Sequence, residues 1–193
     1  MATQKQRSDE TRLKLLTAFR HSFLDRGYAA TTMKHVLDQT GLSKGALYHH
    51  FESKEEIIEA LFEHESRTTI EHVMASIDQT TSPLAQLRAA CLAWTRAVRV
   101  PETSKIIFEI GPAALGARKA KAIEDRNSLY RIESLLSKAI EEGEISAADP
   151  KLIAAFLNAL VAEAGLYDLR TGGDSTPTLA AAIDALFEGM RGH

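Results

Sequence analysis

Start and stop signals for helices recur along the whole chain and leave little room for strands. Three predicted helices begin with a capping residue followed by proline at the first helical position: Ser82-Pro83, Asp149-Pro150 and Thr176-Pro177. Ser53 and Glu56 form a capping box that opens a helix running to about Ser76. Ser8 is predicted to cap the first helix, which Gly27 ends. Alternation of β-branched residues never lasts, so the sequence predicts an all-α protein of about nine helices.

The charge of the chain is distributed unevenly. The net charge is −3, yet residues 1–54 contain nine Lys and Arg against five Asp and Glu, whereas the remaining residues contain 14 against 21. A basic quarter of +4 joined to a body of −7 is the layout of a DNA-reading domain attached to a second domain. Because a bias of four charges can also arise by chance, the charge alone does not establish DNA binding.

The composition is that of an ordinary globular protein, with 45% hydrophobic and 25% charged residues. No stretch approaches the roughly 20 consecutive apolar residues of a membrane span, and the polar N-terminus lacks the apolar core of an export signal. The single cysteine, Cys91, cannot form an intrachain disulfide and is interpreted as a small buried hydrophobic residue. We therefore expect a cytoplasmic protein with no membrane segment, no metal site and no cofactor.

Residues 31–51, TTMKHVLDQTGLSKGALYHHF, contain a helix, a turn and a second short helix. The first helix is predicted from about Thr32 to Thr40, Gly41 supplies the sharp turn, and Ser43 caps the second helix. The residues expected to face the core are Met33, Val36, Leu37, Leu47 and Phe51. This is the geometry that places a recognition helix in the major groove of DNA.

The opposite face of the second helix carries residues suited to DNA. Lys44 lies in the first turn, where a cation is unfavourable to the helix dipole, so a partner explains it better than the helix does. Gly45 costs up to about 1 kcal/mol against alanine, and its expected gain is close approach to DNA. Tyr48 and His49 suit a phosphate or a base edge, and Lys54 suits a phosphate. Each could be an ordinary surface residue, but their combination favours DNA contact.

The stretch from Phe23 to Leu61 resembles the TetR family of one-component regulators. The matching positions are Gly27-Tyr28, Thr31-Thr32, Gly41-Leu42-Ser43, Gly45, Leu47-Tyr48, His50-Phe51 and Ser53-Lys54-Glu55. With the capping residue of the second helix included, the DNA-contacting positions implied are Thr32, Ser43, Lys44, Gly45, Ala46, Tyr48, His49 and Lys54. The chain departs from the family at Val36-Leu37 and Thr40, where Ile-Ala and alanine are frequent, and these differences affect packing more than DNA contact.

The resemblance implies two domains: a three-helix DNA-binding domain over residues 1–54 and a helical ligand-binding and dimerisation domain over residues 55–193. Residues 107–130 and 141–167 resemble one subgroup of TetR C-terminal domains, without the tryptophans that often follow the GPxxLG segment there. The last two predicted helices are rich in alanine, which allows close approach between helices. Two such helices from each subunit would form a four-helix dimer interface, and packing within the monomer is the alternative.

Candidate effector residues lie on the helices of the second domain. Trp94 belongs to an apolar stripe after Pro83, while Phe156 and Glu163 share a face of another helix, where a carboxylate among aromatic rings could meet a cation. Asn127 and Tyr130 could donate hydrogen bonds to the ligand. The alternative is that these residues form plain core, with Glu163 pairing across a dimer.

The resemblance therefore implies a repressor that binds a palindromic operator as a homodimer and is released by a small molecule. An alternative on the same fold is a DNA-bound partner of division or nucleoid proteins that has no small ligand. The motifs HExxH, GxSxG, Walker A and the dinucleotide fingerprint are not found, so the protein is not expected to be an enzyme. Activation instead of repression stays open, because promoter position decides it.

Overall fold

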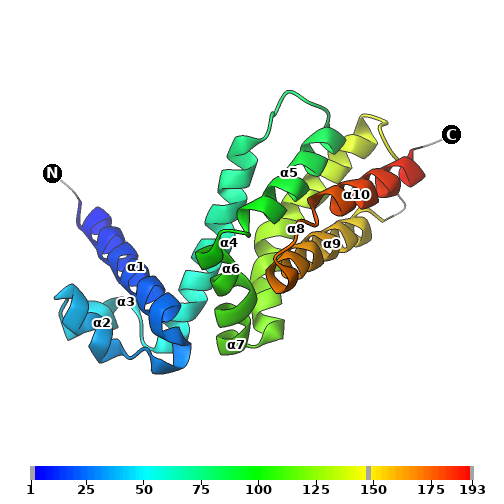
Figure 1. Cartoon of the computed structure of the whole chain (residues 1–193). Coiled ribbons are helices and arrows are strands. Elements are labelled where there is room, and N and C mark those ends of the chain that lie inside the picture. Colours follow the sequence, from blue (N-terminus) through cyan, green and yellow to red (C-terminus); the bar gives the residue numbers. More distant parts are fainter. Residues whose placement is uncertain (1–2, 147–148, 192–193) are drawn as a thin grey trace. The chain divides into compact units, whose positions relative to one another are not determined.

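The computed structural model describes residues 3–146 and 149–191, and every regular element in these ranges is a helix (Figure 1). In chain order they are α1 (Gln4–Ala30), α2 (Met33–Thr40), α3 (Lys44–His50), α4 (Lys54–Ser76), α5 (Pro83–Ala97), α6 (Pro101–Ser104), the π-helix η1 (Lys105–Ile110), α7 (Gly111–Leu115), α8 (Ala117–Glu141), α9 (Pro150–Thr171) and α10 (Thr176–Met190). The all-α prediction is confirmed. Between residues 101 and 115 the chain forms three short elements, α6, η1 and α7.

The first compact unit contains the chain up to Glu65 together with the later segment Lys105–Ala120. In it, α1 packs against α2, α3 and η1. The largest fully buried side chains of this unit are Leu15, Phe19, Phe23, Leu47, Phe51, Ile57, Ile58, Leu61, Phe62 and Ile106. The Lys105 ammonium donates a hydrogen bond of 2.7 Å to the Leu24 carbonyl and so ties η1 to α1.

The extent of this unit differs from the division predicted at residue 54. The first turns of α4 belong to it, and so does the start of α8, where Lys119 Nζ lies 2.8 Å from Glu59 Oε2 and 3.3 Å from Glu55 Oε1. A boundary drawn from sequence follows the end of the helix-turn-helix, whereas packing joins segments that are far apart along the chain. The functional division at residue 54 stays a prediction.

The first helix begins earlier than predicted. Thr3 caps it, and Thr3 and Gln6 form a capping box in which Thr3 Oγ1 accepts from the Gln6 amide at 3.2 Å and Gln6 Oε1 accepts from the Thr3 amide at 2.7 Å. Ser8 lies within α1, so its predicted role as the cap is wrong. Gly27 interrupts the helical path with a φ of 80°, although the helix resumes as far as Ala30.

The second compact unit contains Ser66–Ser104 and the chain from Lys121 onward. Within it α5, α9 and α10 pack on one another. Its fully buried core side chains include Leu87, Leu136, Ala139, Ala154, Leu157 and Ile183. Cys91 is part of this core, and burial raises the pKa of its thiol to about 12, so the interpretation of Cys91 as a buried packing residue is confirmed. The helices α4 and α8 each begin in the first unit and continue into the second.

The three helix starts that were predicted from a capping residue followed by proline have different outcomes. Ser82 Oγ accepts from the Ala85 amide at 3.4 Å, and the Asp149 carboxylate accepts from the Leu152 amide at 3.0 Å, so these two predicted caps are confirmed. The third helix begins one residue earlier than predicted. Its N-cap is Ser175, and Thr176 is already the first helical residue.

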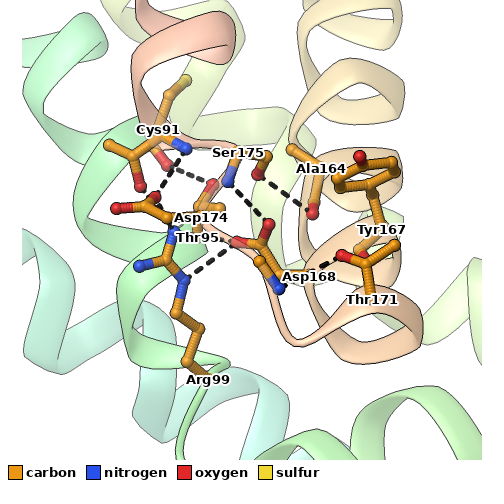
Figure 2. Close-up of polar contacts among 11 residues, drawn as sticks. Cys91, Thr95, Arg99, Ala164, Tyr167, Asp168, Thr171, Asp174 and Ser175 are labelled. Atoms are coloured by element: carbon orange, nitrogen blue, oxygen red, sulfur yellow. Dashed lines mark hydrogen bonds and ion pairs between the residues drawn. The ribbon is translucent and has the colours of Figure 1, made fainter.

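A polar cluster joins the end of α5 to the turn between α9 and α10 (Figure 2). Arg99 Nε donates to Asp168 at 2.8 Å, and the same guanidinium contacts Asp174 and the Thr176 hydroxyl. The buried Asp168 carboxylate also accepts from the Ser175 amide at 2.7 Å. The hydrogen bond from Arg99, followed by those from Thr176, lowers the pKa of Asp174 to about 2. Burial of the Asp168 carboxylate is tolerated because each of its two oxygens accepts a hydrogen bond.

Glu124 on α8 gives a testable dependence of stability on pH. The pKa of this carboxyl is raised to about 7. Burial is the main cause, Lys121 opposes the shift, and Asp125 adds to it. The folded state holds the proton up to about pH 7, whereas the unfolded chain releases it near pH 4.5. The free energy of unfolding is therefore expected to fall as the pH rises between these values, by about 2 kcal/mol when the partial exposure of the group is allowed for.

Urea unfolding of the wild type and Glu124→Gln at a series of pH values checks this prediction. The variant is expected to lose this decline and to be the more stable protein at pH 8. Glu141→Gln, at an exposed glutamate of the same helix, is the control and is expected to keep the wild-type profile. Parallel profiles for the wild type and Glu124→Gln would contradict the prediction.

Candidate nucleic-acid interface

The predicted helix-turn-helix is present, with its turn set by one glycine. α2 begins after Thr32, whose hydroxyl accepts from the His35 amide at 3.1 Å, and it ends at Gly41. Gly41 has a φ of 66°, a left-handed conformation that favours glycine, and its amide donates to the Leu37 carbonyl at 3.0 Å. Ser43 then caps α3 by accepting from the Ala46 amide at 3.0 Å. Two helices are thereby joined by a three-residue turn.

The inner face of α3 is fixed to the core of the first unit. Leu47 is fully buried, and Phe51, which follows the helix, is 1% exposed. Arg12 of α1 lies over the Phe51 ring at 5.1 Å from its centroid. The short recognition helix is therefore held by packing against α1, and its outer face is left without a covering element in the described part of this unit.

Four of the predicted DNA-contacting residues, Lys44, Gly45, Tyr48 and His49, are exposed positions of α3, whereas Thr32 caps α2 and Ser43 caps α3. Six of the eight are exposed: Thr32, Ser43, Lys44, Gly45, Tyr48 and His49. Lys44 Nζ lies 5.7 Å from the centroid of the Tyr48 ring, so a cation and an aromatic hydroxyl project together from the first two turns of α3. Ala46 is half-buried behind them. The structure brings Lys44 and Tyr48 together on α3, and the contact of the eight predicted residues with DNA stays a prediction.

Gly45 is not required by the fold. Its φ is not positive, and a methyl group added there would lie 3.9 Å from Ser43 Oγ and otherwise in open space. Alanine at this position would strengthen the helix by up to about 1 kcal/mol. A glycine retained against that gain is consistent with close approach by a partner.

Lys54 is positioned differently from the other predicted contacts. Its ammonium donates to the carbonyls of Tyr28 at 2.9 Å and Thr31 at 3.0 Å and lies 4.3 Å from the centroid of the Tyr28 ring. Lys54 thus closes the end of α1 onto the start of α4, which the sequence-based interpretation missed. The predicted phosphate contact at Lys54 is untested, and two of its three donors are already used within the fold.

A cluster of basic and aromatic rings lies at the end of α3. The ring centroids of His49 and His50 are 5.1 Å apart. Burial lowers the pKa of His50, the neighbouring His49 and Arg12 lower it further, and Asp9 opposes them. These effects favour the neutral form of His50. Arg12 was missed as a residue of this region, although the excess of basic residues at the N-terminus was a general signal for it.

The five predicted effector residues are not brought into one site. Trp94 packs half-buried against the core of the second unit, whereas Phe156 and Glu163 lie exposed on α9, where Glu163 pairs with Arg170. Asn127 and Tyr130 line one groove between α4 and α8. No group of three or more His, Cys, Asp and Glu side chains that could hold a metal ion occurs within residues 3–146 and 149–191.

The outer face of α9 is apolar and exposed. On this face the side chains of Leu152, Phe156, Leu160 and Tyr167 are between 40% and 51% exposed, and the Glu163–Arg170 ion pair lies among them. α9 is also long and apolar enough to cross a membrane by these two criteria alone, with a mean hydropathy of 1.5 over its most apolar window and one third of that window buried. Core helices of soluble proteins meet the same criteria, so the feature to be explained is the uncovered face.

Comparisons with known proteins match both parts of the chain. Residues 15–61 match the family described as bacterial regulatory proteins, tetR family, and residues 84–190 match the family described as tetracyclin repressor-like, C-terminal domain. A relative, the HTH-type transcriptional repressor KstR2 of Mycobacterium tuberculosis, is 32% identical over 124 residues. That match covers 63% of this chain and 62% of the relative, so the chain spans less than two thirds of the relative's length.

Solved structures match almost the whole chain. A TetR-family transcriptional regulator from Pectobacterium atrosepticum has a TM-score of 0.73 and 29% identity, covering 97% of this chain and 94% of that one. The structure of a SmeT–triclosan complex has a TM-score of 0.66 and 27% identity, covering 84% and 82%. The likeness therefore extends over both compact units.

Proposed function

Because the chain belongs to the TetR family of bacterial regulatory proteins, we propose that it is a cytoplasmic transcriptional regulator that binds a palindromic operator as a homodimer. The observation that carries the proposal is the outer face of α3. A lysine, a tyrosine and a histidine project from a short helix whose other face is buried, beside a glycine that the fold does not require. These side chains have the donors that recognise phosphates and base edges in the major groove.

The exposed apolar face of α9 supports the homodimer. A helix that is apolar on its outer side as well as on its inner side lowers its free energy by meeting another apolar surface. A second copy of α9 related by a two-fold axis supplies such a surface. Two recognition helices about 34–36 Å apart would then enter successive major grooves, and the operator would repeat the symmetry of the dimer.

Release by a small-molecule effector completes the proposal. α4 is one continuous helix from Lys54 to Ser76, so it carries residues of both compact units. An effector that prefers another arrangement of the second unit would shift α4 and weaken operator binding. Linkage requires that the operator then weaken effector binding by the same factor. Support comes from the SmeT–triclosan complex, in which a relative of this fold has a small molecule bound.

Selection from randomised duplex DNA at physiological salt tests the proposed operator binding, because affinity from phosphates alone depends strongly on salt. We expect one palindrome to be enriched. Recovery of no common sequence, or of a non-palindromic one, would overturn the proposal of a dimeric operator-binding regulator. A partner of nucleoid or division proteins would instead be distinguished by many chromosomal sites and no response to small ligands.

Tyr48→Ala and Lys44→Ala are each expected to lower affinity for the selected palindrome by roughly 10- to 100-fold, equivalent to about 1–3 kcal/mol. Both side chains are exposed, so the helical circular dichroism and the melting temperature should be unchanged. Fluorescence anisotropy with labelled operator measures the affinity. Lys138→Ala, at an exposed lysine of α8, is the control and should bind as the wild type does.

A further inference from the structure

A groove between α4 and α8 in the second unit has the volume of a small-molecule site. It encloses about 310 Å³ and is lined by arginines Arg67, Arg126 and Arg131 together with Asn127 and Tyr130. We name it the arginine groove. Binding sites for small ligands begin at about 300 Å³, so the groove accommodates a ligand no larger than a substituted ring.

The lining of the arginine groove is dominated by positive charge. Its lining contains three guanidinium groups and one carboxylate, that of Glu71. Arg67 Nη1 donates to Glu71 Oε1 at 3.0 Å, which positions this arginine along the edge of α4. Arg131 is exposed and forms no ion pair with any residue of the described ranges. Glu71 is thus paired with Arg67, and the guanidinium of Arg131 supplies the positive charge available to a ligand.

The groove also offers apolar surface and an ordered amide. Ile70, 8% exposed, lies in the lining, and the Tyr130 side chain is 76% exposed, so its ring presents an open face. Asn127 Nδ2 donates to the buried Ser66 hydroxyl at 3.1 Å, which fixes the orientation of the amide. Fixed polar groups beside an apolar or aromatic surface are typical of small-molecule sites.

We propose that the arginine groove binds a small organic anion, a carboxylate or phosphate carried on an apolar or aromatic body. Guanidinium groups match the planar oxygens of such anions with paired hydrogen bonds. The aromatic body would lie against Tyr130, and the anionic group would meet the guanidinium groups. The inference rests on the proposed function only in assigning this anion the role of effector. The proposed ligand is an anion, whereas the sequence suggested a cation at Glu163.

Nitrogen-15 NMR titration of the full chain tests the site with benzoate and phenyl phosphate as probes and neutral benzamide as their control. Both anions are expected to cause saturable shifts of the Asn127 side-chain amide and the arginine Nε–H groups, and benzamide is not. Arg131→Glu should weaken anion binding about tenfold or more. Arg96→Glu, at an exposed arginine on α5, makes the same charge change elsewhere and should leave binding unchanged.

Absence of saturable shifts, equal binding of benzamide, or equal weakening by both variants would overturn the proposal. Operator-containing duplex could instead shift the NMR signals of the same groups, and Arg131→Glu could lower operator affinity. These two results together would overturn the proposal in favour of a nucleic-acid contact. The effector role is tested by adding benzoate to the operator complex against equal ionic strength of chloride. Unchanged operator affinity would overturn that role alone, whereas failure of the operator selection would overturn the proposed function and leave anion binding standing.

Discussion

Replacing both Phe156 and Leu160 by glutamate is expected to convert the protein from a dimer to a monomer and to lower operator affinity by roughly 10²- to 10⁴-fold. The two side chains are one helical turn apart on the outer face of α9 and are 51% and 40% exposed. In a two-fold interface each substitution occurs twice, so four carboxylates would be brought into one apolar contact. Their desolvation and mutual repulsion would prevent association.

Loss of the proposed dimer would lower operator affinity because each subunit would read only one half-site. When the first recognition helix binds, the second is held beside its half-site at high effective concentration, and a monomer has no such advantage. Sedimentation velocity measures the oligomeric state, and anisotropy with labelled operator measures the affinity. The fold itself should persist, because both side chains lie outside the core and the helical circular dichroism should match that of the wild type.

Val100→Glu is the matched control for this experiment. Val100 is 49% exposed and lies outside α9, so Val100→Glu adds a negative charge at a similar exposure away from the helix face proposed as the interface. The control is expected to remain a dimer with wild-type affinity. A Phe156→Glu/Leu160→Glu variant that still sedimented as a dimer would place the interface elsewhere on the molecule.

Gly111→Ala is expected to lower the free energy of unfolding by roughly 3 kcal/mol, a large effect for a single added methyl group. Gly111 begins α7, and a Cβ there would lie 2.1 Å from Phe62 Cδ2 and 2.9 Å from the Ile106 carbonyl oxygen. Phe62 is fully buried in the first unit, where close packing of the core opposes movement of its ring. Either the ring or the backbone of η1 and α7 must shift, and both movements disturb the packing around Phe62.

Gly189→Ala separates this steric effect from the general effect of removing a glycine. Gly189 lies near the end of α10, and nothing is within 4 Å of a Cβ added there. That variant is expected to be as stable as the wild type, or more stable by up to about 1 kcal/mol, because alanine is the better helix former. Urea unfolding compares the three proteins, and a Gly111→Ala protein as stable as the Gly189→Ala protein would refute the predicted clash.

Residues distant in the chain decided several features that local patterns could not give. The Lys54 ammonium contacts carbonyls 23 and 26 residues earlier, and its place at the start of a helix gave no sign of these contacts. Residues 105–120 belong to the same compact unit as α1 although they follow the predicted boundary by about 50 residues. Phe156 and Glu163 share a helix face as predicted, but that face is exposed, because periodicity identifies the apolar side of a helix and not the surface that covers it.

The sequence by itself determined the helical class, most of the helix starts and the helix-turn-helix with its exposed recognition face. These features depend on residues three or four positions apart and on one glycine at Gly41, so local hydrogen bonding and sterics are sufficient to specify them. Only the tertiary structure decided which segments form each compact unit, that Lys54 closes α1 onto α4, and that Asn127 and Tyr130 share a groove with three arginines. Such arrangements depend on packing between segments far apart in the chain, which maximises the burial of apolar surface and has no counterpart in local spacing.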